Sequence, residues 1–405
     1  MINKIFSPKI NFHTFQKTPE TLNSGSLAQC CDRNNYELNT IADANRVNLE
    51  VVKNMNLDAN NKKHYIENYN GCLLGGAVGD ALGWPVEFSQ LSSIRSRYGE
   101  NGITDLKLVG EKAEITDDTQ MTIFTADGLL KSAIKDFDEN KKPDMSIIYN
   151  SYQNWLGTQY GSYKENENGW ISNIKDLYAN RAPGTTCIGS LRKGIPGSIE
   201  NHINESKGCG GVMRVAPVGL MYYKNPEKAF EIGARCAALT HGSPSAYLPA
   251  GVHSCIIANL VNGQNLTKAV DNSIEVLKKY EGNEDTLELL EKAKEYAKSD
   301  IPTDMAIKLL GEGWHGDEAI AISVYCALKS PDDFEKALIL AVNHSGDSDS
   351  TGAIVGNILG TYLGEDAIPQ KWRKSLELEQ ELKILAKDLL VKPQEIENAE
   401  SRYPI

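Results

Sequence analysis

The sequence predicts an all-α, compact, multi-helix domain with a polar N-terminal extension. Apolar residues recur at spacings of three and four in many segments, which is the periodicity of amphipathic helices. Alternating strand-like runs are scarce, and the best of them, residues 105–110, is short. Two segments carry glycines spaced by four, which places the glycines along one ridge of a helix and predicts close helix–helix contact. The predicted helices are 71–83, 118–134, 211–222, 226–239, 245–261, 266–280, 284–298, 316–329, 333–342, 351–363 and 376–390.

The composition is that of an ordinary soluble globular protein and excludes several classes. Of 405 residues, 41% are hydrophobic and 24% are charged, which argues against a disordered chain and a collagen-like chain. The net charge of −12 argues against sequence-independent nucleic-acid binding, because phosphate contacts need a basic face. No run of 18 apolar residues occurs, so we expect no membrane span.

The two ends of the chain differ from its centre. Residues 1–64 are polar and rich in Asn, and we expect an extension that is either partly disordered or a targeting segment. We expect the globular domain to cover residues 65–392 and a C-terminal tail to cover 393–405. The chain shows no classical secretory signal, and its eight cysteines include no CxxC pair. Reduced thiols and a cytoplasmic location are the default expectation, although non-classical export into a host cell leaves no such mark.

The first glycine segment contains Gly71, Gly75, Gly79 and Gly83. A glycine inside a helix costs about 1 kcal/mol relative to alanine, and close packing is the usual compensation. Pro85 ends this helix, and Glu87 follows in a turn among apolar neighbours. Such an acid has a raised pKa and suits proton transfer; the alternative is an exposed glutamate in a turn.

Adjacent acids open the helix predicted at 118–134. Thr116 is a good N-cap, and Asp117 and Asp118 follow it directly. Capping explains one acid, but two adjacent carboxylates repel each other unless a positive charge lies between them. A bound cation and a simple capping turn therefore both remain open.

A second acidic run precedes the other glycine segment, which contains Gly352, Gly356 and Gly360. Asp347 and Asp349, followed by the hydroxyls of Ser350 and Thr351, can converge on one hard cation. Alternatively, Ser350 or Thr351 caps the following helix. A calcium loop of the EF-hand type is disfavoured because its twelfth position is Ile358 rather than Glu.

Glycine-rich turns at 208–212 and around Gly184 precede predicted helices. Such turns can present backbone N–H groups to a phosphate, although a single one is a weak signal. His241 follows the helix predicted at 226–239, where a dipole-stabilised C-terminal histidine is the default and contact with a ligand is the alternative.

The order of these motifs is more specific than any one of them. G-x-L-x-G-x-x-x-G-D-A-L-G, T-D-D-T-Q-M, G-x-G-G-x-M-R-x-A-P, T-H and G-D-S-D-S-T-G follow one another over about residues 68–365. This series resembles the ADP-ribosylglycohydrolase family, which includes the dinitrogenase-reductase-activating glycohydrolases. The resemblance implies an all-α fold, two Mg²⁺ or Mn²⁺ ions in a cleft, and hydrolysis of ADP-ribose from a modified protein side chain, with arginine as the first candidate.

The resemblance also assigns roles to individual residues of this chain. It implies that Glu87 and Asp349 are catalytic and that the ions are held by Thr116, Asp117, Asp118, Asp347, Asp349 and Ser350. It implies that ADP-ribose is bound by Gly208, Cys209, Gly210, Gly211, Val212, Met213, His241, Gly184, Ser345 and Gly346. Ser350 stands where the family usually has Thr, and we expect its hydroxyl to keep the same role. Cys209 stands where Asn or Ser is frequent, so we expect a polar ligand contact to be missing at this position.

Two alternatives to arginine-linked mono-ADP-ribose remain open. The first is another linkage: serine-linked, ubiquitin-linked, poly-ADP-ribose or O-acetyl-ADP-ribose. The second is a binding module that has lost hydrolysis, which the presence of every metal-motif residue disfavours. The expected partners are ADP-ribose and an ADP-ribosylated protein, without nucleic acid.

Overall fold

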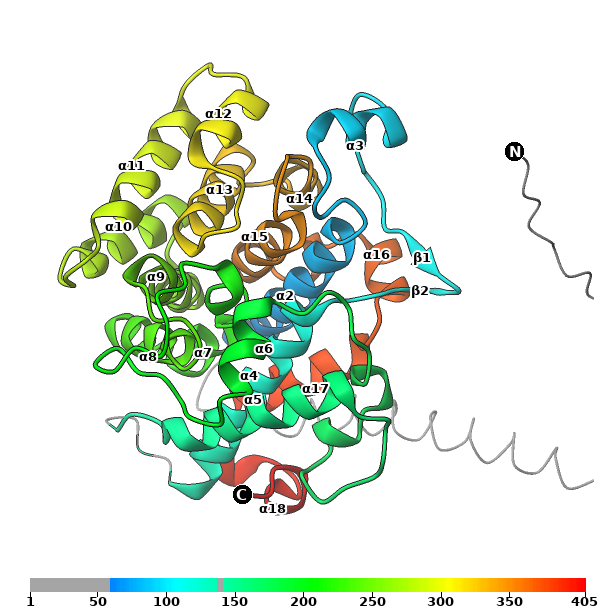
Figure 1. Ribbon diagram of the computed structural model, residues 1–405, viewed down its shortest axis with the longest axis vertical. Helices are drawn as coiled ribbons and strands as arrows, with labels where there is room; N and C mark the ends of the chain where they lie inside the picture. Colours follow the sequence, from blue (N-terminus) through cyan, green and yellow to red (C-terminus); the bar gives the residue numbers. More distant parts are fainter. Residues whose placement is uncertain (1–58, 137, 139–140) are drawn as a thin grey trace, which may run out of the picture. The chain divides into compact units, whose positions relative to one another are not determined.

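A computed structural model describes residues 59–136, 138 and 141–405, which belong to the compact unit formed by residues 56–405. In this part of the chain the secondary structure is 17 α-helices, short 3₁₀ turns and one hairpin of two-residue strands, so the all-α prediction is confirmed (Figure 1). Residues 1–58, to which most of the prediction for the N-terminal extension applies, lie outside the described residues.

The α-helices, in chain order, are α2 (Ala59–Gly83), α3 (Leu91–Tyr98), α4 (Asp117–Lys135), α5 (Met145–Tyr160), α6 (Thr185–Leu191), α7 (Ala216–Met221), α8 (Pro226–Ala238), α9 (Pro244–Val261), α10 (Leu266–Leu277), α11 (Glu284–Lys298), α12 (Thr303–Leu310), α13 (Gly316–Lys329), α14 (Phe334–Val342), α15 (Ser348–Leu363), α16 (Gln370–Ser375), α17 (Glu379–Leu390) and α18 (Ala399–Arg402). The 3₁₀ turns are η1 (Ile171–Asn173), η2 (Lys175–Leu177), η3 (Cys209–Gly211), η4 (Glu365–Ala367) and η5 (Pro393–Glu395). The strands β1 (Leu108–Val109) and β2 (Lys112–Ala113) pair antiparallel.

Most predicted helices are present, but the prediction at 211–222 is wrong in its first half. There the chain forms the turn η3 and then the short helix α7. Helices α3 and α16 were not predicted, because each buries a single side chain, Ile94 and Trp372, and so shows no apolar period. Helix α5 was missed because aromatic and amide side chains interrupt its apolar face.

The centre of the domain consists of helices that are buried nearly all round. Every residue of α9 from 245 to 261 is buried, and α4 and α15 are buried along most of their length. Figure 1 shows α2 and α15 in the interior, with α11–α13 on one side and α16 on the other. In the described part of the chain, no helix is both long enough and apolar enough to cross a membrane.

Helices α2 and α15 pack backbone against backbone through the two glycine ridges. At each glycine of the three facing pairs, an added Cβ would lie 1.9–2.5 Å from the carbonyl oxygen of its partner: Gly71 with Gly360, Gly75 with Gly356, and Gly79 with Gly352. At the end of the ridge, a Cβ on Gly83 would lie 2.5 Å from Cα of Asp349. The close contact predicted from the glycine spacing is confirmed, and its antiparallel register brings the end of α2 to the start of α15.

Residues 393–405, expected to form a tail, contain η5 and α18. The Tyr403 side chain is buried, and its hydroxyl donates a hydrogen bond to Asp388 of α17.

A single added methyl group tests this packing. Gly356→Ala should lower the free energy of unfolding by at least about 3 kcal/mol, because its Cβ meets rigid backbone rather than a movable side chain. Gly157→Ala in α5 is the matched control, since its added Cβ would meet no atom of the described residues within 4 Å. This substitution should raise stability by up to about 1 kcal/mol. Urea unfolding followed by circular dichroism measures the free energy of unfolding of both variants. Equal effects of the two substitutions would contradict close backbone packing along the glycine ridge.

Candidate functional site

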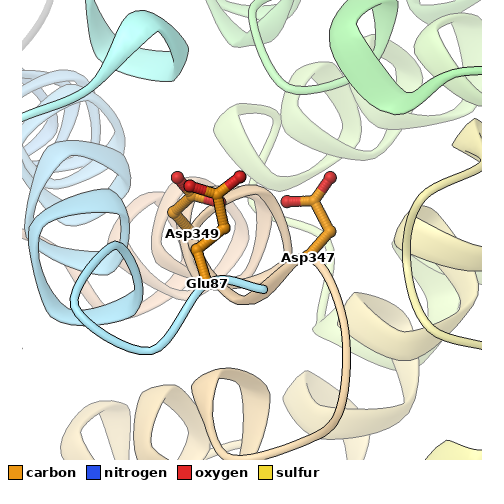
Figure 2. Close-up of side chains that lie close together, drawn as sticks. All are labelled: Glu87, Asp347 and Asp349. Atoms are coloured by element: carbon orange, nitrogen blue, oxygen red, sulfur yellow. The ribbon is translucent and has the colours of Figure 1, made fainter. Parts of the chain in front are cut away.

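Three carboxylates from distant parts of the chain converge beside the end of the glycine ridge. Each of Glu87, Asp347 and Asp349 offers an oxygen within 4.8 Å of the others (Figure 2). Glu87 lies in the turn after α2, and the two aspartates lie at the start of α15. The contact between Gly83 and Asp349 is therefore what brings the three side chains into one cluster.

The turn that carries Glu87 is fixed by its neighbours. The amides of Val86 and Glu87 both donate to the carbonyl of Gly83, and the Val86 side chain is fully buried. Phe88 has a positive φ of 60°, and its ring stacks on Trp314 with centroids 5.2 Å apart. Because the backbone of this turn is held on both sides of Glu87, the carboxylate has a defined position.

The acids at the start of α15 are positioned by capping. Asp347 is the N-cap, and its Oδ1 accepts from the amide of Ser350 at 3.2 Å. Its own amide donates to the carbonyl of Glu312 at 2.8 Å. The expectation that Ser350 or Thr351 caps this helix is wrong, because the helix begins at Ser348 and places both residues inside its first turn.

The cluster concentrates negative charge. Burial raises the pKa of Glu87 to about 11, and the charges of Asp349 and Asp347 add to the shift. Burial, with the charge of Asp347, also raises the pKa of Asp349 well above its usual range. Glu87 is half-buried, so the alternative of an exposed turn glutamate is wrong. These carboxylates need a proton or a cation to lie so close together.

The other acidic turn, at the start of α4, adjoins this cluster. Thr116 is the N-cap as predicted, since its Oγ1 accepts from the amide of Asp118 at 3.3 Å. The same Oγ1 lies 3.5 Å from Oδ2 of Asp349 and so connects the two turns. Asp117 accepts from the amide of Gly184 at 2.9 Å. Oδ2 of Asp118 is buried and has no hydrogen-bond partner in the described part of the chain.

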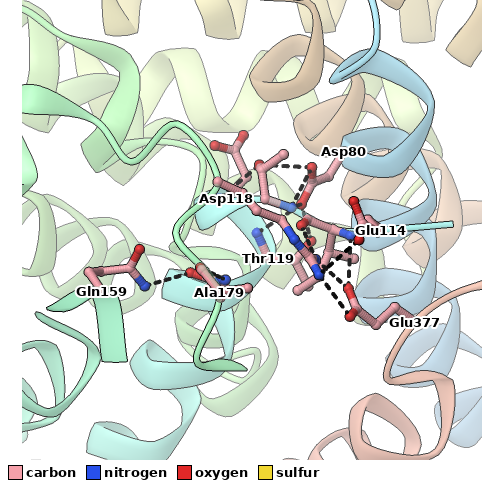
Figure 3. A network of polar contacts seen from close by, with 11 residues as sticks. Asp80, Glu114, Asp118, Thr119, Gln159, Ala179 and Glu377 are labelled. Atoms are coloured by element: carbon pink, nitrogen blue, oxygen red, sulfur yellow. Dashed lines mark hydrogen bonds and ion pairs between the residues drawn. The ribbon is translucent and has the colours of Figure 1, made fainter. Parts of the chain in front are cut away.

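Asp80 is a residue of this site that the sequence analysis did not single out. Its fully buried carboxylate accepts from the amide and the hydroxyl of Thr116 and from the amide and the hydroxyl of Thr119 (Figure 3). It thereby ties α2 to the start of α4. The available signal was an acid in an otherwise apolar glycine helix.

The glycine turn at 208–212 lies against the acidic cluster. Cys209 Sγ donates to Oδ2 of Asp347 at 2.7 Å and accepts from Oγ of Ser350 at 3.7 Å. The thiol thus contacts Asp347, which the sequence analysis assigned to the metal site. The expectation that Cys209 lacks a polar contact to ADP-ribose stays a prediction. The side chains of Val212 and Met213 are buried, and Sδ of Met213 lies 3.9 Å from Oγ of Ser350.

His241 lies just beyond the C-terminal end of α8, where its amide donates to the carbonyl of Ala237 at 3.0 Å, and its side chain lies against this turn. Helix α8 ends at Ala238, and the His241 side chain is buried. Burial, together with the charge of Arg214, lowers the pKa of His241 to about 3. The imidazole is therefore neutral near pH 7, and the expectation of a charged histidine stabilised by the helix dipole is wrong.

The other residues assigned to ADP-ribose have structural contacts of their own. Ser345 Oγ accepts from the amide of Leu91 at the start of α3. Gly346 has a φ of 143°, and an added Cβ would lie 1.9 Å from the carbonyl oxygen of Glu312. Gly184 belongs to the acidic turn through its hydrogen bond to Asp117.

Comparison with known proteins identifies the family. The sequence model described as ADP-ribosylglycohydrolase matches residues 61–399. The chain belongs to the ADP-ribosylglycohydrolase family. It is thus a hydrolase of glycosyl bonds that acts on ADP-ribose-containing substrates.

Three relatives illustrate the range of this ADP-ribosylglycohydrolase family. An uncharacterized protein of Archaeoglobus fulgidus is 28% identical, over 80% of this chain and 96% of its own. Mouse ADP-ribosylhydrolase ARH3 is 26% identical, over 80% and 91%. ADP-ribosylarginine hydrolase Tri1 of Serratia proteamaculans is 23% identical, over 80% and 79%.

The residues of this ADP-ribosylglycohydrolase fit a hard divalent cation. The converging atoms are carboxylate oxygens with a threonine hydroxyl beside them, and Mg²⁺ and Mn²⁺ prefer oxygen ligands. The buried Oδ2 of Asp118, which has no partner in the part of the chain that the structure describes, is a further oxygen that a cation would pair with.

Metal binding should reverse the effect that neutralising one acid of the cluster has on the free energy of unfolding. Without divalent ions, Asp349→Asn should raise the free energy of unfolding by at least about 1 kcal/mol, because it removes repulsion within the cluster. With Mg²⁺ or Mn²⁺ at 100 times the dissociation constant, the wild type should gain about 2.7 kcal/mol and the variant much less.

Thermal unfolding with EDTA and with each ion measures both effects. Asp176→Asn, a change at an exposed acid outside the cluster, should behave as the wild type in every condition. A metal-induced gain of the same size in Asp349→Asn would contradict metal binding at this cluster.

Proposed function

We propose that this enzyme removes mono-ADP-ribose from a modified arginine of a protein, using two Mg²⁺ or Mn²⁺ ions held between the two acidic turns. The observation that carries the proposal is the convergence of Glu87, Asp347 and Asp349 next to the Thr116 turn. One ion would be held from the turn formed by Thr116, Asp117 and Asp118, and the other from Asp347, Asp349 and Ser350. Asp349 adjoins both groups.

The chain's own residues then divide the chemistry. When bound, the ions would polarise an attacking water and orient the ribose hydroxyls. Cleavage of the ribose–nitrogen bond passes through an oxocarbenium-like state, so one group must deliver a proton to the leaving nitrogen or take one from water. Glu87 suits this task, because its carboxylate lies in the cluster on a turn that is held at both ends.

The glycine turn would receive the diphosphate. Backbone N–H groups in such a turn favour an anion, whereas the acids beside it repel one. Cys209 contacts Asp347 across this boundary, so the anionic part of the ligand would lie on the turn and its ribose would lie toward the acids. Cations in the cluster would remove the repulsion.

Fewer observations support the choice of arginine as the linked residue than support hydrolysis of ADP-ribose itself. A relative from Serratia proteamaculans is named an ADP-ribosylarginine hydrolase, whereas the mouse relative's name specifies no linkage. The modified protein is the second expected partner. We also propose a cytoplasmic location, with which the six free thiols of the described cysteines agree.

The two acidic turns should both be necessary for turnover. Asp117→Asn and Asp347→Asn should each lower release of ADP-ribose from ADP-ribosylated arginine at least 100-fold, because each removes a ligand charge. Release is measured with Mg²⁺, with Mn²⁺ and with EDTA, alongside serine-linked and poly-ADP-ribose substrates. Full turnover by either variant would refute the ion sites, and release from another linkage alone would refute the arginine assignment.

Glu87 should affect turnover rather than affinity. Glu87→Gln should lower kcat by about 10²- to 10⁴-fold, the usual contribution of a general acid or base, with less than about threefold change in the dissociation constant for ADP-ribose. Glu111→Gln at an exposed position is the control. Equal losses of kcat and of affinity would instead indicate a binding role.

A further inference from the structure

Arg214 is fully buried, and no carboxylate pairs with its guanidinium in the described part of the chain. Its Nη2 donates to the carbonyl of Cys236 at 3.0 Å and to Oγ1 of Thr240 at 2.8 Å. Its Cζ lies 4.3 Å from the ring centroid of Tyr152, and its Nε has no hydrogen-bond partner within residues 59–136, 138 and 141–405. A buried charge without a counter-ion costs several kcal/mol, so a compensating role is expected.

The contacts of Arg214 lead to His241. Thr240 Oγ1 accepts from Arg214 and lies 2.8 Å from Nδ1 of His241. The other acceptor within reach of this hydroxyl, the carbonyl of Ala237, is 3.4 Å away. A hydroxyl has one proton, and its shorter contact is the better hydrogen bond. Thr240 therefore donates to Nδ1, and the imidazole proton resides on Nε2.

His241 Nε2 faces the glycine turn. An added Cβ would lie 3.4 Å from Nε2 if placed on Gly208 and 3.3 Å from it if placed on Gly210. Because the imidazole is neutral, its tautomer decides what it offers to an anion lying there. A protonated Nε2 donates a hydrogen bond, whereas a bare Nε2 presents a lone pair and repels a phosphate oxygen.

We infer that Arg214 is a positioning residue: through Thr240 it fixes His241 as the Nε2–H tautomer, and its buried charge favours a diphosphate on the turn at 208–212. This inference rests on the proposed function for the identity of the ligand. A purely structural alternative exists, because Arg214 also contacts a carbonyl in the last turn of α8 and would stabilise that helix end. That alternative makes no demand on the tautomer of His241.

Thr240→Val separates the two roles, because it removes the hydroxyl and leaves Arg214 and its contact with α8 in place. Thr240→Ser keeps the hydroxyl and is the matched control. Nitrogen-15 NMR of the imidazoles in the full-length protein, with His241→Gln to assign the signals, should show Nε2–H and a hydrogen-bonded Nδ1 in the wild type and in Thr240→Ser. In Thr240→Val the Nδ1 signal should move to the position of a nitrogen without a hydrogen bond.

Affinity gives the second measurement. Calorimetry should show ADP-ribose binding about tenfold more weakly to Thr240→Val than to the wild type, the size expected for one hydrogen bond, and within about twofold for Thr240→Ser. Adenosine, which lacks the diphosphate, should bind all three proteins equally. Arg214→Met should weaken ADP-ribose binding further, and Arg214→Lys should recover part of the loss. If Arg214→Met does not fold, the Thr240 pair still decides.

The results distinguish failure of this inference from failure of the proposed function. A wild-type His241 protonated on Nδ1, or unchanged ADP-ribose affinity in Thr240→Val, would overturn the inference while the hydrolase proposal stands. Equal loss of affinity for adenosine and ADP-ribose would assign Arg214 and Thr240 a purely structural role. A wild type without affinity for ADP-ribose would overturn the proposed function, and the inference with it.

Discussion

The backbone contact between α2 and α15 is the constraint on which the site depends. The three facing glycine pairs define one antiparallel register, and each step of four residues along α2 matches a step of four back along α15. The next step pairs Gly83 with Ser348 and brings it against the adjoining Asp349, a member of the acidic cluster. Side chains larger than hydrogen would separate the helices and with them Glu87 from both aspartates. Each glycine lowers helix stability by about 1 kcal/mol relative to alanine. The close backbone contact between the two helices, which no other residue permits, offsets this cost.

Charges of opposite sign lie on the two sides of the glycine turn. On one side Cys209 contacts Asp347 of the acidic cluster. On the other side the turn lies against His241, behind which Arg214 is buried without a carboxylate partner among the described residues. Both groups are unfavourable in an apolar interior until a partner of opposite charge arrives. Divalent cations suit the first side and a diphosphate suits the second. ADP-ribose bound together with metal ions would satisfy both at once, which connects the electrostatics to the activity of the family.

Sequence patterns predicted what depends on neighbours along the chain. The Thr116 cap and the glycine ridges are local, and both were found where they were expected. Apolar periods likewise placed most helices, with the first half of the helix predicted at 211–222 as an exception. Asp80 was not assigned to the site, because the threonines that bond to it lie 36 and 39 residues away. Arg214 gave no signal of burial, since an arginine near a helix start normally reaches solvent. The cap of α15 was misplaced because a helix boundary depends on which side chain accepts from its first amides, not on composition.

The contacts of Asp80 bear on how the proposed metal ligands reach their positions. Its carboxylate accepts from four donor groups, the amides and hydroxyls of Thr116 and Thr119, and the hydroxyl of Thr116 lies between Asp80 and Asp349. The start of α4 is therefore held against α2 and α15 by the protein itself, before any cation binds. Asp118, in contrast, keeps a buried carboxylate oxygen to which none of the described residues donates a hydrogen bond. A backbone that is already fixed, beside a carboxylate oxygen that still lacks a partner, is the arrangement of a preorganised binding site. A cation bound there would not have to spend binding energy on assembling the two turns.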